Sequence, residues 1–534
     1  MSRLVFGIDL GTTYSCVAQV DDYDRAVVLK NFEGKNTTPS VAYFGEETEV
    51  IGEEAKNLSV LEPERVVSFV KRSISTDDAY NKPTKFPRGL DPTEISAYIL
   101  KKIVKDANDA GQYPEPIKDV VITCPAYFGT KERLRTKQAG IIAGLNVLAI
   151  INEPTAAAIA YGMKVKDEKI VMVYDLGGGT FDVTIIRVKG GTITVIATGG
   201  DHHLGGVDWD NALSEYILNQ YNKEKGTSYS MDSDPHLKNT LSLLAEENKK
   251  RLSAKDTVNA VLTIEGASSR IELTRAIFDQ LTEFRLEETV DKTNEVIRIA
   301  KQKGFDRIDE VLLVGGSSRM PQIKARIDAE LGCDAKLTDP DECIAKGAAI
   351  YAMNEAYSQA MEEYAEGVRD EKPQSIGLSN QTRVVNVTSK TYGMGFTDEN
   401  DKNKPKIFNM IFANTPLDGN CRASETFSTR EDGQRGVTLP VYESDVANPE
   451  TDKIIEPQMA VPMEEGEPHA LQLSKYYPKG TPVEVVFEID VEGILHVHGE
   501  VGTDSIDFEM KIKGVKDEKE LIKSVAMLSK SNVQ

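Results

Sequence analysis

The most informative stretch of the sequence is Phe6-Gly7-Ile8-Asp9-Leu10-Gly11-Thr12-Thr13-Tyr14-Ser15, because a near-copy of it stands later in the chain as Val173-Tyr174-Asp175-Leu176-Gly177-Gly178-Gly179-Thr180-Phe181-Asp182. Each copy is an apolar strand that ends in Asp-Leu-Gly and continues through a Gly/Thr turn into a second apolar run. Because glycine has no Cβ atom, the N–H groups of such a turn can approach a phosphate closely, and the threonine hydroxyls add donors. The aspartate at each strand end suits Mg²⁺ or its bound waters. We therefore expect two facing hairpins that hold a nucleoside triphosphate from both sides.

A single Asp-Leu-Gly-Thr turn could equally be an ordinary hairpin. Two matched copies in one chain favour a shared phosphate site over two unrelated turns. The chain has no Gly-x-x-x-x-Gly-Lys-Ser/Thr loop and no Gly-x-Gly-x-x-Gly sequence after a strand. We therefore expect the nucleotide to be held differently from the way those common motifs hold it.

Composition narrows the class of protein. A chain of 534 residues is too long for one core, so three or four domains are expected. The net charge of -22 disfavours binding to nucleic acid or to anionic membranes. The five cysteines are scattered without zinc-ligand spacing, which indicates free thiols in a reducing compartment. No signal peptide and no membrane-length apolar run is evident, so the sequence predicts a cytoplasmic protein.

The predicted secondary structure changes along the chain. Residues 1–367 alternate strands, at 4–10, 119–123, 170–175 and 310–314, with helices at 93–108, 236–253 and 341–366. This alternation predicts α/β architecture, and the repeated hairpin predicts two similar lobes with a cleft between them. Residues 368–391 are predicted to be a linker, 392–515 an all-β domain with short alternating strands, and 516–534 a short helical stub.

Four further motifs extend this pattern. They are Ile151-Asn152-Glu153-Pro154-Thr155-Ala156-Ala157-Ala158, Gly205-Gly206-Val207-Asp208-Trp209-Asp210, Gly315-Gly316-Ser317-Ser318-Arg319-Met320-Pro321, and Phe427-Ser428-Thr429 followed by Asp432 and Gln434. Together with the hairpins, in this order, they resemble the 70-kDa heat-shock protein chaperone family of the DnaK type over nearly the whole chain. The resemblance implies a two-lobed ATPase domain of the actin and sugar-kinase type, followed by a peptide-binding β-sandwich.

The resemblance also implies roles in the nucleotide cleft. Asp9 and Asp175 would hold Mg²⁺, largely through its waters, and Lys71 would place positive charge beside the γ-phosphate. Glu153 and Asp182 would orient or polarise the attacking water, and Thr180 would bond the transferred group. The phosphates would be held by Gly11, Thr12, Thr13, Tyr14, Gly177, Gly178 and Gly179. Without the surrounding motifs, the alternative roles would be a solvated surface charge for Lys71, a helix cap for Glu153 and a structural carboxylate for Asp182.

The adenosine is expected between a helix and a loop. Glu246, Lys249, Lys250 and Ser253 lie at i, i+3, i+4 and i+7 on one helix face, which without the resemblance would be an exposed charged face. The family packs adenine between this face and the segment with Gly315, Gly316, Ser317 and Arg319, with Asp341 near the ribose. The family often has arginine where Lys250 stands, and lysine stacks on adenine less well.

In the β domain, the resemblance implies binding of extended apolar segments of unfolded polypeptides. The matching positions are Tyr392, Met394, Phe427, Val437, Leu439 and Val483, although inward apolar residues of any β-sandwich would look the same. Tyr392 and Met394 replace smaller aliphatic residues of the family, so the sequence does not indicate the width of the pocket or which peptides it prefers.

Two features depart from the family. Residues 383–389 read Arg-Val-Val-Asn-Val-Thr-Ser, so Asn386 replaces the family's acidic residue and Ser389 its proline. The resemblance therefore implies interdomain coupling, and stimulation by a J-domain co-chaperone or a nucleotide exchange factor, less strongly than it implies the fold. The family's helical lid is also expected to be missing.

The sequence is therefore identified as an ATP-hydrolysing chaperone that binds and releases unfolded polypeptide. One alternative is a nucleotide-switched peptide-binding scaffold with weak interdomain coupling, which the altered linker favours. A sugar kinase of the same superfold is disfavoured by the β domain, and a filament-forming relative is a further alternative, which sedimentation with ATP would test. His496 and His498 share a strand face but have no evident third metal ligand, so a structural role is preferred.

Overall fold

The computed structural model describes residues 4–46, 48–74, 89–111, 113, 115–162, 167–369, 371–373, 383–398, 404–463, 468–490, 493–510, 515–531 and 533–534. Two parts of the sequence predictions, the linker at 374–382 and the end of the β domain at 511–514, lie outside the described residues. Within the described ranges, no helix has the length and apolar character needed to cross a membrane.

Two sheets with the same strand order form the centre of the first part of the chain. The first has the order β3(Ala26–Leu29)-β2(Tyr14–Val20)-β1(Val5–Asp9)-β8(Asp119–Cys124)-β9(Asn146–Asn152). The second contains β12(Thr192–Asp201)-β11(Phe181–Lys189)-β10(Lys169–Leu176)-β15(Glu310–Val314)-β16(Lys336–Leu337). In both, three antiparallel strands are followed by two parallel ones. The repeated hairpin of the sequence is therefore the centre of a repeated lobe, and the predicted strands are confirmed.

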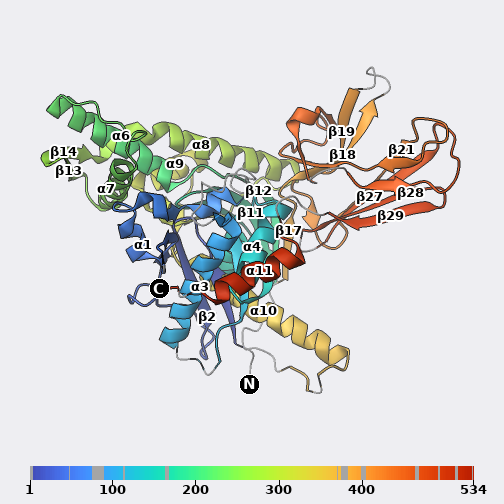
Figure 1. Ribbon diagram of the computed structural model, residues 1–534, viewed down its shortest axis with the longest axis horizontal. Helices are drawn as coiled ribbons and strands as arrows, with labels where there is room; N and C mark the ends of the chain where they lie inside the picture. Colours follow the sequence, from blue (N-terminus) through green and yellow to red (C-terminus); the bar gives the residue numbers. More distant parts are fainter. Residues whose placement is uncertain are drawn as a thin grey trace.

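Helices and two smaller sheets surround these central sheets (Figure 1). The helices are α1(Glu53–Leu58), α3(Pro92–Gly111), α4(Thr130–Ile142), α5(Glu153–Gly162), α6(Gly206–Lys225), α7(Pro235–Ala254), α8(Arg275–Gln302), α9(Pro321–Leu331) and α10(Cys343–Ala365). The smaller sheets are β6(Glu49–Ile51)-β5(Val41–Phe44)-β7(Val66–Ser68) and β13(Thr257–Ile264)-β14(Ala267–Thr274). The predicted helices correspond to α3, α7 and α10. Asp91 caps α3, because its side chain accepts a hydrogen bond from Glu94 N at 2.9 Å. In return, the side chain of Glu94 accepts a hydrogen bond from Asp91 N.

Helix α10 joins the two lobes through two glycines. A Cβ on Gly347 would lie 1.7 Å from the carbonyl oxygen of Ala156 in α5. A Cβ on Gly7 in β1 would lie 2.1 Å from Ala349 N in the same helix. Because backbones touch at these points, no larger residue fits, and α5, α10 and β1 are held in one arrangement.

The β domain contains two main sheets. They are β24(Ile454–Ile455)-β19(Lys404–Ile411)-β18(Thr391–Asp398)-β23(Val441–Ser444)-β25(Val461–Pro462) and β21(Arg422–Ser428)-β27(Pro482–Ile489)-β28(Leu495–Val501)-β29(Asp504–Glu509). A short pair, β22(Gly436–Thr438)-β26(Ala470–Gln472), adds to them. Their buried apolar residues form one core, which includes Leu439, Phe487 and Leu495.

The linker residues continue the second lobe's sheet. β17(Arg383–Val387) pairs in parallel with β12, through Thr192 to Thr194, and in antiparallel with β20(Pro416–Leu417) of the β domain. One sheet thus runs from the ATPase-like part into the β domain. The sequence placed these residues in a linker, and hydrogen bonding to the open edge of β12 makes them a strand here.

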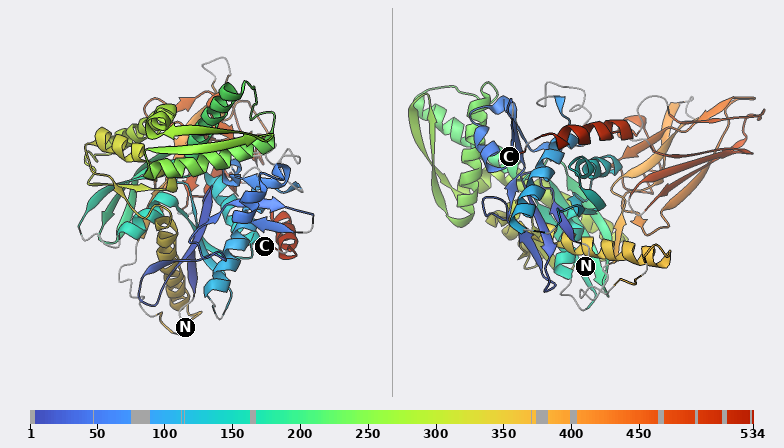
Figure 2. Two further views of the ribbon diagram at one scale, coloured as in Figure 1. Left: turned by 90° about the vertical axis from the view of Figure 1, so that its left-hand side faces the viewer. Right: turned by 60° about the horizontal axis from the view of Figure 1, so that its bottom comes forward.

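The end of the chain returns to the first lobe. Helix α11(Glu518–Ser529) lies beside α3 and α4, and both views in Figure 2 show it against that lobe. Lys516 pairs with Asp91 at 2.5 Å, and Lys101 donates to the carbonyl of Leu528 at 2.7 Å. Gln534 N donates to Glu49 O at 2.9 Å, which extends the edge of β6.

Replacing Gly347 by alanine should destabilise the protein, because α5 and α10 must separate to admit the methyl group. Overpacking of this kind costs roughly 1–3 kcal/mol. Urea unfolding followed by circular dichroism measures the loss. Ser358→Ala, at an exposed position of the same helix, should change stability by less than about 0.5 kcal/mol. Equal unfolding midpoints for the two variants would contradict this account of the helix crossing.

Candidate nucleotide site

The two Gly/Thr hairpins meet at their turns. A Cβ on Gly178 would lie 2.1 Å from Thr13 Oγ1, and one on Gly179 would lie 2.2 Å from Thr12 Cγ2. Each turn therefore needs glycine where the other turn's threonine occupies the space. The hairpins face each other, as the repeat predicts, and the strands that carry them come from different lobes.

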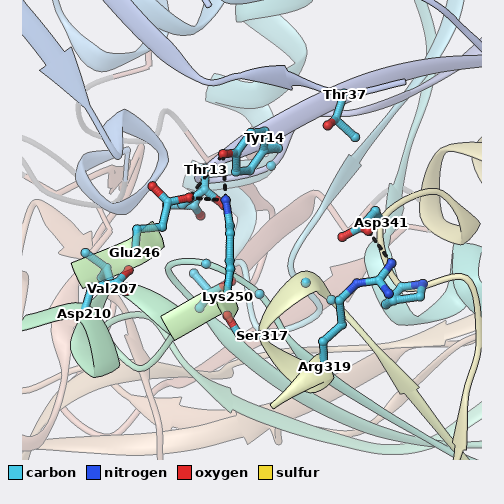
Figure 3. A pocket seen from close by; sticks show the side chains of 18 of the residues that line it. Thr13, Tyr14, Thr37, Val207, Asp210, Glu246, Lys250, Ser317, Arg319 and Asp341 are labelled. Atoms are coloured by element: carbon cyan, nitrogen blue, oxygen red, sulfur yellow. Dashed lines mark hydrogen bonds and ion pairs between the residues drawn. The ribbon is translucent and has the colours of Figure 1, made fainter. Parts of the chain in front are cut away.

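A cavity of ≈ 530 Å³ opens beside these turns, between the lobes (Figure 3). This volume lies in the range of pockets for nucleotide-sized ligands. The structure brings to this cavity all but two of the residues that the sequence predicts for the nucleotide and its metal. They are Asp9, Gly11, Thr12, Thr13, Tyr14, Lys71, Glu153, Asp175, Gly177, Gly178, Thr180, Glu246, Lys249, Lys250, Ser253, Gly315, Gly316, Ser317, Arg319 and Asp341.

Gly179 and Asp182 lie behind the wall of the cavity. Asp182 is buried and uses one carboxylate oxygen to accept a hydrogen bond from Ala126 N at 3.0 Å. Burial and the charge of Glu153 raise the pKa of Asp182 well above its usual range. From this position Asp182 can hold the residues that surround the cavity in place, but it does not reach a ligand in the cavity directly.

Three carboxylates of the cavity share one poorly solvated region. Burial and the nearby charge of Glu153 raise the pKa of Asp9 to about 7. The same two causes, with Asp9 added, raise the pKa of Asp175 well above its ordinary value. Carboxylates that destabilise one another in this way favour a bound cation.

Lys71 supplies one positive charge to this cluster. It follows Phe69, whose φ of 58° turns the chain into a short 3-10 helix, η2(Val70–Ser73), and it is only 5% exposed. Its ammonium pairs with the carboxylate of Glu153, at the start of α5. Burial by itself would lower the pKa of Lys71, but Glu153 and Asp9 outweigh burial and raise it. Lys71 therefore remains charged inside the cavity.

The donor set also fits a magnesium ion. Asp175 Oδ2 is buried and has no hydrogen-bond partner among the described residues, so one oxygen is available. No three His, Cys, Asp or Glu side chains converge on a metal position in the described parts of the chain. Mg²⁺ commonly keeps several waters and takes few protein ligands, so a site with two aspartates and ligand phosphates suits it.

The opposite end of the cavity is closed by charged side chains from both lobes. Glu246 on α7 binds Lys56 at 2.5 Å and Lys250 at 2.6 Å, and Tyr14 donates to it at 3.1 Å. Burial acts to raise the pKa of Glu246, but Lys56 and Lys250 outweigh it and hold the pKa at about 2. Arg319 and Asp341 form a second pair at 2.5 Å (Figure 3). These pairs surround the space predicted for adenosine.

Lys249 has a different environment from its neighbour Lys250. It is buried, and its ammonium donates to Gly206 O at 2.9 Å and to Asp210 Oδ2 at 2.8 Å. Its ammonium group therefore joins α7 to the start of α6, and the residue still lines the cavity.

Several residues of the site were not predicted. Lys56 binds Glu246 across the cleft, and Arg72 donates to Gly179 O and to Asp208 Oδ2, both at 2.6 Å. Asp208 belongs to a motif already noticed in the sequence, and Arg72 directly follows Lys71, so the two could have been found as a possible ion pair. Lys56 stands in a short, ordinary charged helix, and nothing near it in the sequence indicates its partner.

The predicted peptide-binding residues lie in and beside the core of the β domain. Tyr392, Met394, Leu439 and Val483 are buried in the core of the β domain, whereas Phe427 and Val437 are half-buried beside it. The hydroxyl of Tyr392 lies 3.1 Å from Thr130 Oγ1 in α4. Tyr392 thus also contributes to the boundary between the two parts of the molecule.

That boundary is built from hydrogen bonds at three places. Ser389 Oγ donates to Phe128 O at 2.8 Å, and Thr130 Oγ1 donates to Gly493 O at 3.0 Å. Farther along, Asn414 Oδ1 accepts from Thr198 N at 2.8 Å, and Lys303 donates to Asn414 O at 2.7 Å. Together with β17, these contacts hold the β domain against both lobes.

Comparison with known proteins gives a consistent result. The sequence model of the family described as Hsp70 protein matches residues 5–532. The chaperone protein DnaK of Thermotoga neapolitana is 38% identical over 507 residues, which cover 93% of this chain and 78% of that protein. The chaperone protein DnaK of Thermosipho melanesiensis is 38% identical over 509 residues, covering 92% and 77% respectively. With a match that covers nearly the whole chain, including both hairpins and the β domain, this protein belongs to the Hsp70 family.

Proposed function

We propose that this chain performs the ATP-dependent chaperone function of its family by hydrolysing ATP to ADP and phosphate in the cleft and by binding and releasing extended apolar segments of unfolded polypeptides in the β domain. The ATPase part, 1–367, has the two-lobed architecture of the actin and sugar-kinase type in this proposal. One observation carries it: a buried lysine stands among the carboxylates of Asp9, Glu153 and Asp175 at the meeting point of the two Gly/Thr turns, in a cavity of nucleotide size.

In the cleft, Gly11, Thr12, Thr13 and the glycines of the second turn would donate to the β- and γ-phosphates. Asp9 and Asp175 would hold Mg²⁺, which when bound offsets the charge of the phosphates and of the leaving group. Lys71 would stabilise the charge that develops on the transferred phosphoryl group.

The attacking water would be oriented by Glu153, whose carboxylate is already fixed by Lys71. Asp182 is a positioning residue in this scheme, since its oxygen holds Ala126 N. Thr180 lines the cavity beside the second turn and would bond the transferred group.

Coupling of the two activities would pass through β17 and the contacts around it. The support is that the linker strand is hydrogen-bonded to both domains at once, so nucleotide-dependent movement of β12 would reach the β domain directly. A J-domain co-chaperone and a nucleotide exchange factor are the partners that this scheme requires.

A second candidate is a peptide-binding scaffold whose domains are weakly coupled. One observation favours it: the side-chain oxygen of Asn386 in β17 is buried and lacks a hydrogen-bond partner among the described residues. An unsatisfied polar atom costs roughly 1–3 kcal/mol, which weakens docking of the strand.

Lys71→Ala should slow single-turnover hydrolysis of ATP by at least about 100-fold, because the developing charge loses its buried cation. Nucleotide should still bind, since the turns and the adenosine end are unchanged. Rapid-quench measurement of ATP cleavage tests the first statement, and calorimetric titration with ADP tests the second. Lys223→Ala, at an exposed lysine of α6, is the control. Wild-type turnover in the Lys71 variant would rule out the proposed role.

Val387→Asp should abolish release of peptide by ATP while leaving peptide affinity in ADP unchanged. Val387 is 3% exposed, and burying an unpaired carboxylate costs more than the roughly 1–3 kcal/mol of a typical coupling. Anisotropy of a labelled apolar peptide, titrated with protein in ADP and in ATP with Mg²⁺, measures both.

Val368→Asp, at a valine that is 75% exposed, is the matched control and should behave as wild type. If the wild type binds peptide equally in both nucleotides, the scaffold function is correct instead. If Val387→Asp still releases peptide with ATP, β17 does not carry the coupling.

A further inference from the structure

Two carboxylates face each other across the boundary between the ATPase part and the β domain. Glu132 lies on α4 and Glu443 on β23. A Cβ on Gly129 would lie 3.1 Å from Glu132 Oε2 and 3.4 Å from Glu443 Oε2, so both carboxylates border this glycine. Glu132 is only 6% exposed, and its Oε2 has no hydrogen-bond partner within the described ranges.

The space between them is closed by the neighbouring interdomain contacts. Thr130 Oγ1, two residues before Glu132, bonds Tyr392 Oη and Gly493 O. Ser389 Oγ donates to Phe128 O on the other side of Gly129. The two carboxylates therefore become neighbours, away from water, only when the domains are docked.

The cations nearby are largely engaged elsewhere. Lys390 pairs with Asp445 at 2.5 Å, and Arg133 donates to Phe128 O and to Asn152. Lys131 and Lys390 lower the pKa of Glu443, but burial and Glu132 outweigh them.

Two other titratable groups face this region. Burial lowers the pKa of His202 to about 4, so it stays neutral near neutral pH. Burial also raises the pKa of Tyr392, so its hydroxyl stays protonated. Neither group changes charge between pH 6 and 8.5. Among the groups named here, Glu443 is therefore the one that can respond to pH in that range.

We propose that the β domain and the ATPase part dock with uptake of one proton at Glu443, which docking places beside Glu132, so that docking weakens as the pH rises through neutrality. A proton on Glu443 removes one of the two negative charges and turns its carboxylate into a hydrogen-bond donor. Without that proton, two like charges oppose each other at the interface.

The sign of the effect follows from the two states. Docking raises the pKa of Glu443 from 4.5 to about 7, chiefly through burial and next through Glu132. In the undocked molecule both side chains meet water, so the ordinary value returns. Between these values the docked state holds the additional proton, and docking strengthens by up to roughly tenfold for each unit of pH decrease. Above pH 7 this gain is lost.

Small-angle X-ray scattering measures the docked fraction of the full chain. The experiment uses a sub-denaturing urea concentration at which half of the wild-type molecules are docked at pH 7. From pH 6 to pH 8.5 the docking constant of the wild type should fall by about tenfold. Glu443→Gln replaces the titrating carboxyl group by a neutral amide, so its docked fraction should stay constant across this range. Glu132→Gln removes only the second cause of the raised pKa of Glu443, so its docking constant should fall with pH by less than that of the wild type.

Glu484→Gln, at an exposed position of β27 in the β domain, is the matched control and should expand with pH as the wild type does. Because the two glutamine variants lie in different domains, a folding defect in one leaves the other informative. A wild-type docked fraction that is independent of pH would overturn the proposal. So would a Glu443→Gln variant that expands with pH as much as the wild type does.

Discussion

The ammonium of Lys71 among the carboxylates of Asp9, Glu153 and Asp175 is the constraint that the ATPase part depends on. Four ionisable groups this close together, three of them buried, are tolerated only if they compensate one another or take up further ions. The four residues come from η2, β1, α5 and β10, so both lobes must be correctly placed before the charges can balance. The cavity is consequently a property of the closed pair of lobes and of neither lobe alone.

Close backbone contacts provide that placement. The glycines of the facing turns, together with Gly7 and Gly347, stand where a Cβ would collide with the opposite element. The contacts of Gly7 and Gly347 are stiff because they involve main-chain atoms, which cannot change rotamer. The duplicated strand order gives two similar rigid bodies, and α10 is packed against elements of both. Movement between the lobes is then expected as rotation about these contacts.

Much of this arrangement was predictable from local sequence. An aspartate at the end of an apolar strand, followed by a Gly/Thr turn, indicates its structure without knowledge of distant residues, and most predicted cavity residues lie where the motifs placed them. Partnerships across the cleft were not predictable, because Lys56 and Arg72 acquire their partners only when the lobes close. The same holds for β17, since residues 383–387 become a strand through the free edge of β12, and for Asp182, whose distance from the cavity depends on packing. The catalytic and peptide-binding roles remain predictions.

The sheet that crosses from the ATPase part into the β domain has a consequence for the separated state. When β17 leaves, β12 becomes an edge strand with a row of unpaired N–H and C=O groups. Such an edge can accept any extended chain, including one from another molecule. The pairing of β12 with β17 covers only three residues and starts at the charged Arg383, which limits how well a foreign strand can imitate it. A protein that binds unfolded polypeptides would thus have, at the boundary between its two parts, a short strand edge that could pair with another chain unless β17 covers it.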